Sequence, residues 1–387
     1  MRLRPFYLHQ ASANCLFFQP VFFVFYEHAI GMSVPAILWL QAYNLSLRAL
    51  LELPLGALAD RWSRRGCLVA SGLAVAAGAA VLLVAPSLAA AIVAETMFST
   101  ANALRSGADS ALLYDALARE DLLSRYPEAE GRMRAMASLG AGVTAVAGGV
   151  LAAMDPRWPY AAAVVTSFVA ALVASRLPER RHPVHDDRRR LMGEALQVAR
   201  TDVGVRWTIA LAILTVVSSH VYYFLQQPYL GAIGVPVWAF GVVFAATKLV
   251  TAATAAAAHR LDATLAPRRA ATVMLLVPAL GLAAMSGVHR PVGALLVVSR
   301  GVLDGLWEPL LNVYMNRLAP SRLRATLLSL QNLSARLALA LALAVLGVAT
   351  GAVGVHGTLA AAAVVTAILG ALLVSRHRAA GCRTDVV

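Results

Sequence analysis

The chain alternates long apolar runs with short polar segments. Each run approaches the length of about 20 residues that an α-helix needs to cross a bilayer. The runs are continuous and lack the apolar–polar alternation of membrane-barrel strands, so the pattern predicts helices. We expect twelve spans, near residues 8–30, 34–58, 66–85, 88–117, 132–153, 159–177, 204–230, 236–258, 269–287, 291–317, 324–349 and 356–376.

A polar segment divides the spans into two sets of six. Residues 178–203 form the longest gap between apolar runs, and they are rich in Arg, His and Asp, as is typical of a solvated linker. We therefore expect an N-terminal six-helix bundle over 1–177 and a C-terminal bundle with its tail over 204–387. Prolines near predicted helix starts, where a missing N–H costs little, favour this division: Pro35, Pro86, Pro159, Pro236 and Pro291.

Composition excludes the main soluble classes. Hydrophobic residues make up 59% of the 387 residues and charged residues 14%, with a mean hydropathy of +0.69. An ordinary soluble domain has about 25% charged residues, so neither a water-soluble enzyme nor a disordered chain is expected. Cys15, Cys67 and Cys382 are far apart, which predicts no disulfide framework and no metal site. The sequence has no phosphate-binding P-loop, so ATP is not expected as the energy source, and we expect no cofactor. The first apolar stretch is too long for the h-region of a signal peptide, so no cleavable signal peptide is expected.

The basic residues indicate orientation. Most of the 33 Arg and Lys residues fall in the termini, the linker and the loops on one side, whereas Arg157 and Arg290 are the two on the opposite side. This bias places both termini in the cytoplasm of a multi-pass protein. The formal charge of +13 therefore reflects topology and contact with anionic lipid headgroups rather than nucleic-acid binding. An Arg- and Ala-rich, Lys-poor composition suggests a bacterial inner-membrane protein.

The two halves carry matching landmarks in the same order. Such parallel repeats are typical of one class of transporters. The matched residues are Arg48 and Lys248, the pairs Arg105–Asp109 and Arg300–Asp304, and the segments 132–135 and 322–325.

Ionisable residues inside spans are costly, so each marks a place that faces protein or water. The predicted spans 3, 6, 9 and 12 carry none in their interiors, which indicates that these four face lipid while the others line a cavity. Glu27 and Glu95 lie nearer the outer ends of spans 1 and 4. The residues at cavity depth are Arg48, Glu52, Arg105, Asp109, Lys248, Arg300, Asp304, Glu308 and Arg336, with the polar Gln19, Gln226 and Asn312.

The loop after the second span carries a family signature. Residues 56–65 read Gly-Ala-Leu-Ala-Asp-Arg-Trp-Ser-Arg-Arg, which resembles the G-x-L-A-D-R-x-G-R-R loop of the major facilitator superfamily, with Ser63 in place of the second Gly. The resemblance implies an all-α membrane fold of two six-helix bundles related by a pseudo-two-fold axis, working by alternating access. It also implies a cytoplasmic gate made of Gly56, Asp60, Arg61, Arg64, Arg65 and Asp115.

In that gate Asp60 would meet the start of span 11 near Arg324, and Arg64 or Arg61 would reach Asp115. The alternative is ordinary headgroup contact by basic loop residues. Within the spans, Arg105–Asp109 and Arg300–Asp304 are each spaced one helical turn apart and can pair. These pairs are either internal salt bridges or sites that bind substrate or a proton. Asp304 and Glu308 are the first candidates for proton coupling, followed by Asp109 and Glu27.

Span 5 bears on the direction of transport. Gly148–Gly149 resembles half of an element found in proton-coupled exporters of the superfamily, whereas Thr144–Ala145 replaces its Gly-Pro. Small residues there also suit close helix packing. We expect proton-coupled export of a small organic solute by a monomer. Uptake of an anionic or zwitterionic metabolite is the alternative, and a membrane sensor or scaffold without transport is a third reading.

Overall fold

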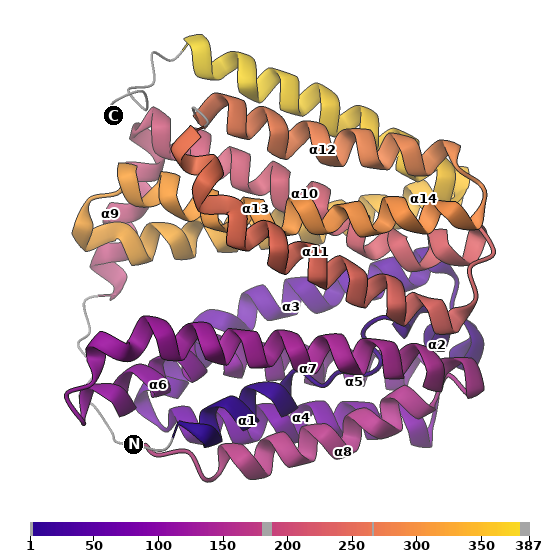
Figure 1. Cartoon of the computed structure of the whole chain (residues 1–387), viewed down its shortest axis with the longest axis horizontal. Helices are drawn as coiled ribbons and strands as arrows, with labels where there is room; N and C mark the ends of the chain where they lie inside the picture. Colours follow the sequence, from indigo (N-terminus) through magenta and orange to yellow (C-terminus); the bar gives the residue numbers. More distant parts are fainter. Residues whose placement is uncertain (1–2, 180–187, 265–266, 380–387) are drawn as a thin grey trace. The chain divides into compact units, whose positions relative to one another are not determined.

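The chain forms helices joined by short loops. The computed structural model describes residues 3–179, 188–264 and 267–379, and within them it contains helices and no strands (Figure 1). Two compact units divide the chain. Unit 1 comprises residues 1–184 and 236–245, and unit 2 comprises 185–235 and 246–387. The bundle boundaries expected at 177 and 204 stay a prediction, and residues 180–187 of the expected linker lie outside the described part.

Unit 1 holds the N-terminal elements. In chain order they are α1 (Arg4–Ala13), α2 (Phe22–Phe25), the π-helix η1 (Tyr26–Ile30), α3 (Val34–Arg61), α4 (Arg64–Val84), α5 (Leu88–Arg105), α6 (Ala108–Ala118), the 3₁₀-helix η2 (Leu123–Arg125), α7 (Tyr126–Met154) and α8 (Trp158–Ala174).

Unit 2 holds most of the remaining elements. They are α9 (Arg188–Thr201), α10 (Val203–Ala232), α11 (Val237–Thr264), whose first residues belong to unit 1, α12 (Pro267–Gly287), η3 (Pro291–Gly293), α13 (Ala294–Leu318), η4 (Ser321–Leu323) and α14 (Arg324–Ala379).

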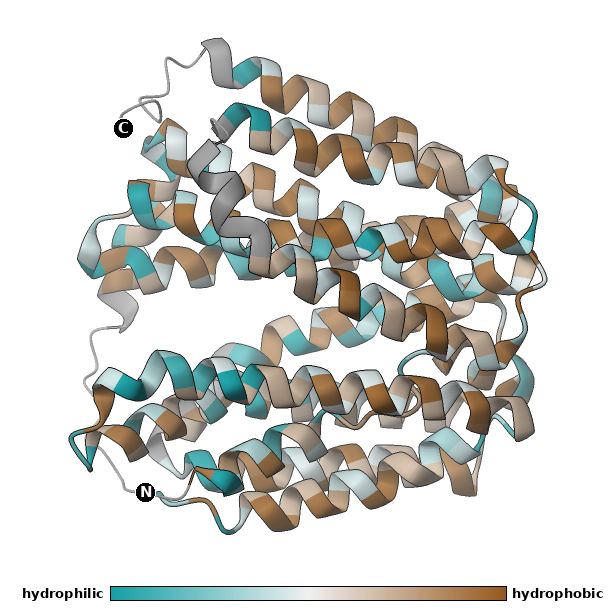
Figure 2. Ribbon diagram, viewed as in Figure 1, coloured by the Kyte–Doolittle hydropathy of each residue, from teal (hydrophilic) through white to brown (hydrophobic). Residues whose placement is uncertain are grey.

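Several helices suit a bilayer. In the described ranges, six helical segments are long and apolar enough to cross a membrane, and hydrophobic residues run along most of α8 and α12 (Figure 2). The 56-residue α14 is interrupted at Gly354, whose φ of 68° and ψ of −177° are not helical, so it contains two helices. These helices correspond to the expected spans 324–349 and 356–376. The total of twelve spans stays a prediction.

The first expected span is not a continuous helix. Residues 14–21 separate α1 from α2, and the chain continues into the π-helix η1. Asn14 contributes to the break because its Nδ2 donates to the Gln10 carbonyl oxygen at 2.8 Å, a local bond that competes with helix continuation. Pro20, which lacks an N–H, also lies in this segment. Short π-helices occur often at functional sites.

The expected span 88–117 is also broken. α5 ends at Arg105, and Gly107 adopts φ 75°, a left-handed conformation that glycine reaches without the steric cost of a Cβ atom. The helix restarts as α6 at Ala108. Consequently Arg105 and Asp109 are not one turn apart on a single helix.

Glycines permit close packing inside each unit. In unit 1, a Cβ atom at Gly148 of α7 would lie 2.0 Å from the Phe17 carbonyl oxygen. In unit 2, Cβ atoms at Gly301 and Gly305 of α13 would each lie 2.5 Å from a backbone oxygen of α11. Small residues at these positions let helix backbones approach closely, as in other membrane bundles.

Candidate functional site

Arg105 and Asp109 of unit 1 lie beside the C-terminal part of α1. Arg105 donates from Nη1 to the Ala13 carbonyl oxygen at 3.1 Å, where the C-terminal carbonyls of α1 favour a cation. Asp109 accepts from Gln10 Nε2 and from its neighbouring Ser110 amide. The expected Arg105–Asp109 ion pair is therefore wrong for the described structure. The reason is the left-handed turn at Gly107, which removes the i,i+4 geometry.

Two partly buried arginines of unit 1 form no ion pair with a carboxylate in the described part of the chain. Arg48, on α3, is partly buried, and its Nε is buried without a hydrogen-bond acceptor. Among the described residues neither Arg48 nor Arg105 forms an ion pair. The nearby carboxylate of Glu52 accepts a hydrogen bond from Ser106 Oγ. This region of unit 1 therefore carries positive charge that no described carboxylate pairs with directly.

A buried carboxylate joins three segments of unit 1. Glu95 on α5 is 5% exposed. Its Oε1 accepts from the Tyr26 hydroxyl of η1 at 2.6 Å and from Gln41 Nε2 of α3 at 2.8 Å, and its Oε2 accepts from Asn44 Nδ2 of α3 at 2.6 Å. All three donors are neutral, and no basic side chain in the described part of the chain contacts Glu95. We call Glu95, Tyr26, Gln41 and Asn44 the Glu95 cluster.

The sequence predicts only that Glu95 lies near the outer end of a span, and its pattern does not mark Glu95 as a site residue. One signal was available, because Gln41 and Asn44 are three residues apart and so share a face of α3. The third donor comes from the π-helix at the end of a broken span, which periodicity does not predict.

Unit 2 holds the second charged cluster. Arg300 and Asp304 of α13 form the expected ion pair, with Nη2 and Oδ2 3.0 Å apart. The pair is confirmed because α13, unlike α5, continues unbroken between them. Ser219 Oγ of α10 also donates to Asp304, and the Arg300 guanidinium lies over the Tyr223 ring at 5.0 Å. Asp304 therefore has a cationic partner, whereas Glu95 has none.

The other predicted positions are spread over both units. Glu308 is exposed on α13 and makes no ion pair within the described residues, so it does not join the Arg300–Asp304 pair. Gln226 is buried in α10, with its Oε1 lacking a hydrogen-bond partner. The remaining candidates are partly buried on or beside helices of the two units: Gln19, Glu27, Lys248, Asn312 and Arg336.

Part of the expected cytoplasmic gate is present. Arg64 Nη1 at the start of α4 lies 2.5 Å from Asp115 Oδ2 of α6, which is one of the two pairings that the signature implies. Gly56 lies in α3. The side chains of Asp60 and Arg61 lie outside the described part, and the gating role of these residues stays a prediction.

Ser63, which replaces a signature glycine, forms two side-chain hydrogen bonds. Its Oγ caps α4 by accepting from the Gly66 amide at 2.7 Å, and its hydroxyl donates to Glu179 Oε2 at 2.7 Å. The Arg65 amide donates to Glu179 Oε1 at 3.0 Å. Glu179 thus binds the N-terminal end of α4, where the helix dipole favours an anion. Sequence reasoning missed Glu179.

Among the described residues, Cys15 and Cys67 form no disulfide, and Cys382 lies outside them. In the described residues of both units, the candidate functional groups are therefore charged and hydrogen-bonding side chains on apolar helices.

Comparisons with known proteins agree with this arrangement. The nucleoside transporter NupG matches with a TM-score of 0.80 and 13% identity over 97% of this chain and 99% of NupG. A bacterial homologue of the human lysosomal transporter Spinster matches with a TM-score of 0.74 and 13% identity over 97% of this chain and 96% of that protein. A POT family transporter bound to a thioalcohol-conjugated peptide matches with a TM-score of 0.72 and 12% identity, covering 96% and 94%.

At these identities the structural matches establish the fold alone, and no curated protein sequence matches the chain. The sequence family gives the further assignment. The model of the Major Facilitator Superfamily matches residues 11–343. Since that range covers most of the 387 residues, and the structure has the all-α fold of solved transporters, the chain belongs to the Major Facilitator Superfamily of membrane transporters.

Proposed function

We propose that this protein exports a small organic compound across the cytoplasmic membrane in exchange for protons. The proposal of proton coupling rests on the surroundings of Glu95. Its buried carboxylate accepts hydrogen bonds from three neutral donors, and no described basic side chain neutralises it. Burying a charge is costly unless it is compensated, so binding of a proton is the natural way to neutralise Glu95.

Protonation would rearrange the cluster. An ionised carboxylate only accepts hydrogen bonds and therefore suits all three donors, whereas a protonated one must also donate its O–H. The Tyr26 hydroxyl can rotate to accept, which reverses the bond between α5 and η1. Proton binding at Glu95 is thereby linked to contacts among η1, α3 and α5.

We propose export as the direction of transport because Gly148–Gly149 resembles half of the element found in proton-coupled exporters of the superfamily. Gly148 packs against the Phe17 backbone, a contact that also fits simple helix packing. The solved relatives support the class of substrate, because they are named as a nucleoside transporter and a POT family transporter with a bound peptide. Both are transporters of small organic solutes.

Uptake of an anionic or zwitterionic metabolite is the second candidate. It is favoured by Arg48 and Arg105, whose charges have no acidic partner among the described residues. A substrate carboxylate or phosphate could form charge-assisted bonds with either guanidinium.

A transport assay in cells that lack their own pumps distinguishes export from uptake. Cells carrying this protein or an empty vector are loaded with, or exposed to, a panel of organic solutes, with and without an uncoupler. Export predicts lower retention of at least one solute, restored by the uncoupler. Uptake predicts greater accumulation instead, and no solute responding in either direction would contradict a transport role.

A further inference from the structure

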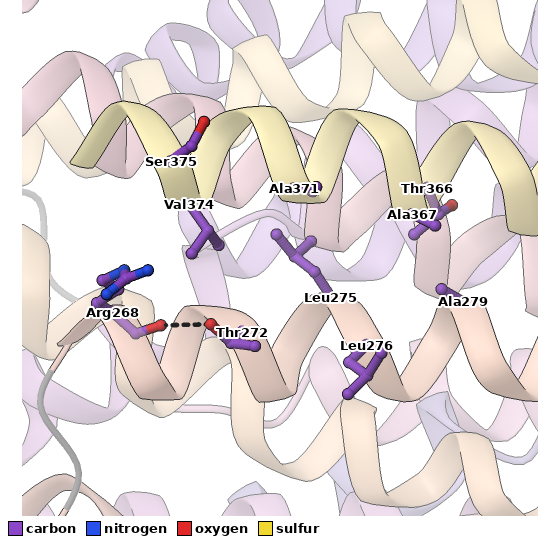
Figure 3. Close-up of a pocket in the computed structure, with 11 residues that line it drawn as sticks. Arg268, Thr272, Leu275, Leu276, Ala279, Thr366, Ala367, Ala371, Val374 and Ser375 are labelled. Atoms are coloured by element: carbon purple, nitrogen blue, oxygen red, sulfur yellow. Dashed lines mark hydrogen bonds between the residues drawn. The ribbon is translucent and has the colours of Figure 1, made fainter. Parts of the chain in front are cut away.

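Unit 2 contains an apolar groove that the transport proposal does not use. It runs between α12 and the C-terminal part of α14 and has a volume of about 360 Å³ (Figure 3). Leu275, Leu276 and Ala279 line it from α12, and Ala367, Ala371 and Val374 line it from α14. The volume lies within the range of roughly 300–1,000 Å³ that is typical of ligand pockets.

Three hydroxyls line the groove, and each already has a partner inside the protein: Thr366 Oγ1 lies 3.3 Å from Ser218 Oγ, and the other two donate to backbone carbonyls. Thr272 Oγ1 donates to the Arg268 carbonyl oxygen at 2.9 Å, and Ser375 Oγ donates to the Leu372 carbonyl oxygen at 2.9 Å. These bonds turn the two hydroxyls toward their own helices, so the walls of the groove offer an occupant mainly hydrocarbon.

Arg268 supplies the polar end. Its side chain lies at one end of the groove, next to Val374 and Ser375 (Figure 3). Its Nε is buried without a hydrogen-bond acceptor, and Arg268 forms no ion pair with any described residue. Arg269 follows it in the sequence, so this end of α12 carries two positive charges.

The dimensions suit one leaflet of a bilayer. From Arg268 to Ala279 the helix rises about 16 Å, at 1.5 Å per residue, and half of a hydrocarbon core is about 15 Å. Leu276, Leu280 and Leu372 are exposed beside the groove, as expected for a surface that meets lipid. The positive-inside distribution of charge places Arg268 at the cytoplasmic leaflet.

We propose that this groove binds one anionic phospholipid of the inner leaflet, with an acyl chain between α12 and α14 and the phosphate on Arg268. A guanidinium binds phosphate oxygens through two parallel hydrogen bonds. Arg268 can supply them, because its side chain is partly buried and forms no ion pair with a described residue. The negative net charge of the lipid complements the positive charge of Arg268, which lines the groove.

The test is native mass spectrometry of the full-length protein in a neutral detergent, titrated with phosphatidylglycerol. We expect one tightly bound lipid, with an apparent affinity about tenfold weaker in Arg268→Gln, the loss expected for one charge-assisted contact. Arg269→Gln is the matched control, because Arg269 does not line the groove, and it should change affinity by less than about twofold. Ala371→Leu fills the groove and should also weaken binding.

Two other ligands identify the source of the phosphate. Glycerol 3-phosphate, which has no acyl chain, should not compete with the lipid at the same concentration, and phosphatidylcholine should bind more weakly than phosphatidylglycerol. Equal lipid binding by the wild type and Arg268→Gln, or full competition by glycerol 3-phosphate, would overturn the proposal. A melting curve for each variant tests whether it is folded. If Ala371→Leu does not fold, the comparison of wild type with Arg268→Gln decides whether the groove binds the lipid.

Discussion

At the residue scale, the buried carboxylate of unit 1 and the partly buried carboxylate of unit 2 have different partners. Asp304 has the Arg300 guanidinium at 3.0 Å, which compensates its charge directly. Glu95 has only the neutral Tyr26, Gln41 and Asn44. We therefore propose Glu95, rather than Asp304, as the group that exchanges a proton, which reverses the order of candidates that the sequence alone favoured.

Two ion pairs of unit 1 differ in burial, so we expect them to differ in strength. The side chains of Arg64 and Asp115 are 26% and 19% exposed, whereas those of Arg132 and Glu128 are 65% and 53% exposed. A double-mutant cycle of Arg64→Gln and Asp115→Asn should give a coupling of about 1–2 kcal/mol in the free energy of unfolding. The same cycle on Arg132 and Glu128 should give about 0.3–0.5 kcal/mol. Equal couplings measured by denaturant unfolding in detergent would argue against a structural role for the Arg64–Asp115 pair.

At the scale of elements, the broken helices of unit 1 distinguish the two halves. The repeated Arg-x-x-x-Asp spacing is realised as an ion pair on α13 but not at the α5–α6 junction, because Gly107 turns the chain out of the helix. Spans, their polarity and the Arg300–Asp304 pair could be predicted from periodicity. The turn at Gly107 could not, since a glycine within an apolar run is compatible with a continuous helix.

The Glu95 cluster illustrates the same limit. A glutamate inside an apolar run is visible in the sequence, but its donors come from η1 and α3, which only the folded arrangement brings together. The Arg64–Asp115 pair could be anticipated because the loop signature fixes which residues face each other. The Ser63–Glu179 hydrogen bond could not be anticipated, since Ser63 stands where the signature has a glycine.

Gly107 should be intolerant of a side chain. At φ 75°, Gly107→Ala should destabilise the protein by about 1 kcal/mol, the cost of a left-handed conformation for an L-residue. Gly131→Ala is the matched control, because Gly131 lies inside α7 with no atom within 4 Å of its added Cβ. It should stabilise by about 0.5–1 kcal/mol through helix propensity. Thermal unfolding in detergent measures both, and a stable Gly107→Ala variant would contradict the assigned break.

At the scale of the whole molecule, the charge bias predicts which loops face outward. In a variant whose native cysteines are replaced, Arg157→Cys should react with a membrane-impermeant maleimide in intact cells. Glu128→Cys, an exposed position at the start of α7, should react only after the cells are permeabilised. Both positions reacting from the same side would contradict the predicted topology.

We propose that solute movement is coupled to protons through Glu95. The most direct measurement uses proteoliposomes that contain a pH-sensitive dye, to which a solute found in the cell screen is added under an imposed pH gradient. The wild type should show solute-dependent proton flux, and Glu128→Gln, an exposed control, should match it. Glu95→Gln should lose that proton flux while still exchanging labelled for unlabelled solute. Undiminished solute-dependent proton flux in Glu95→Gln would contradict the account.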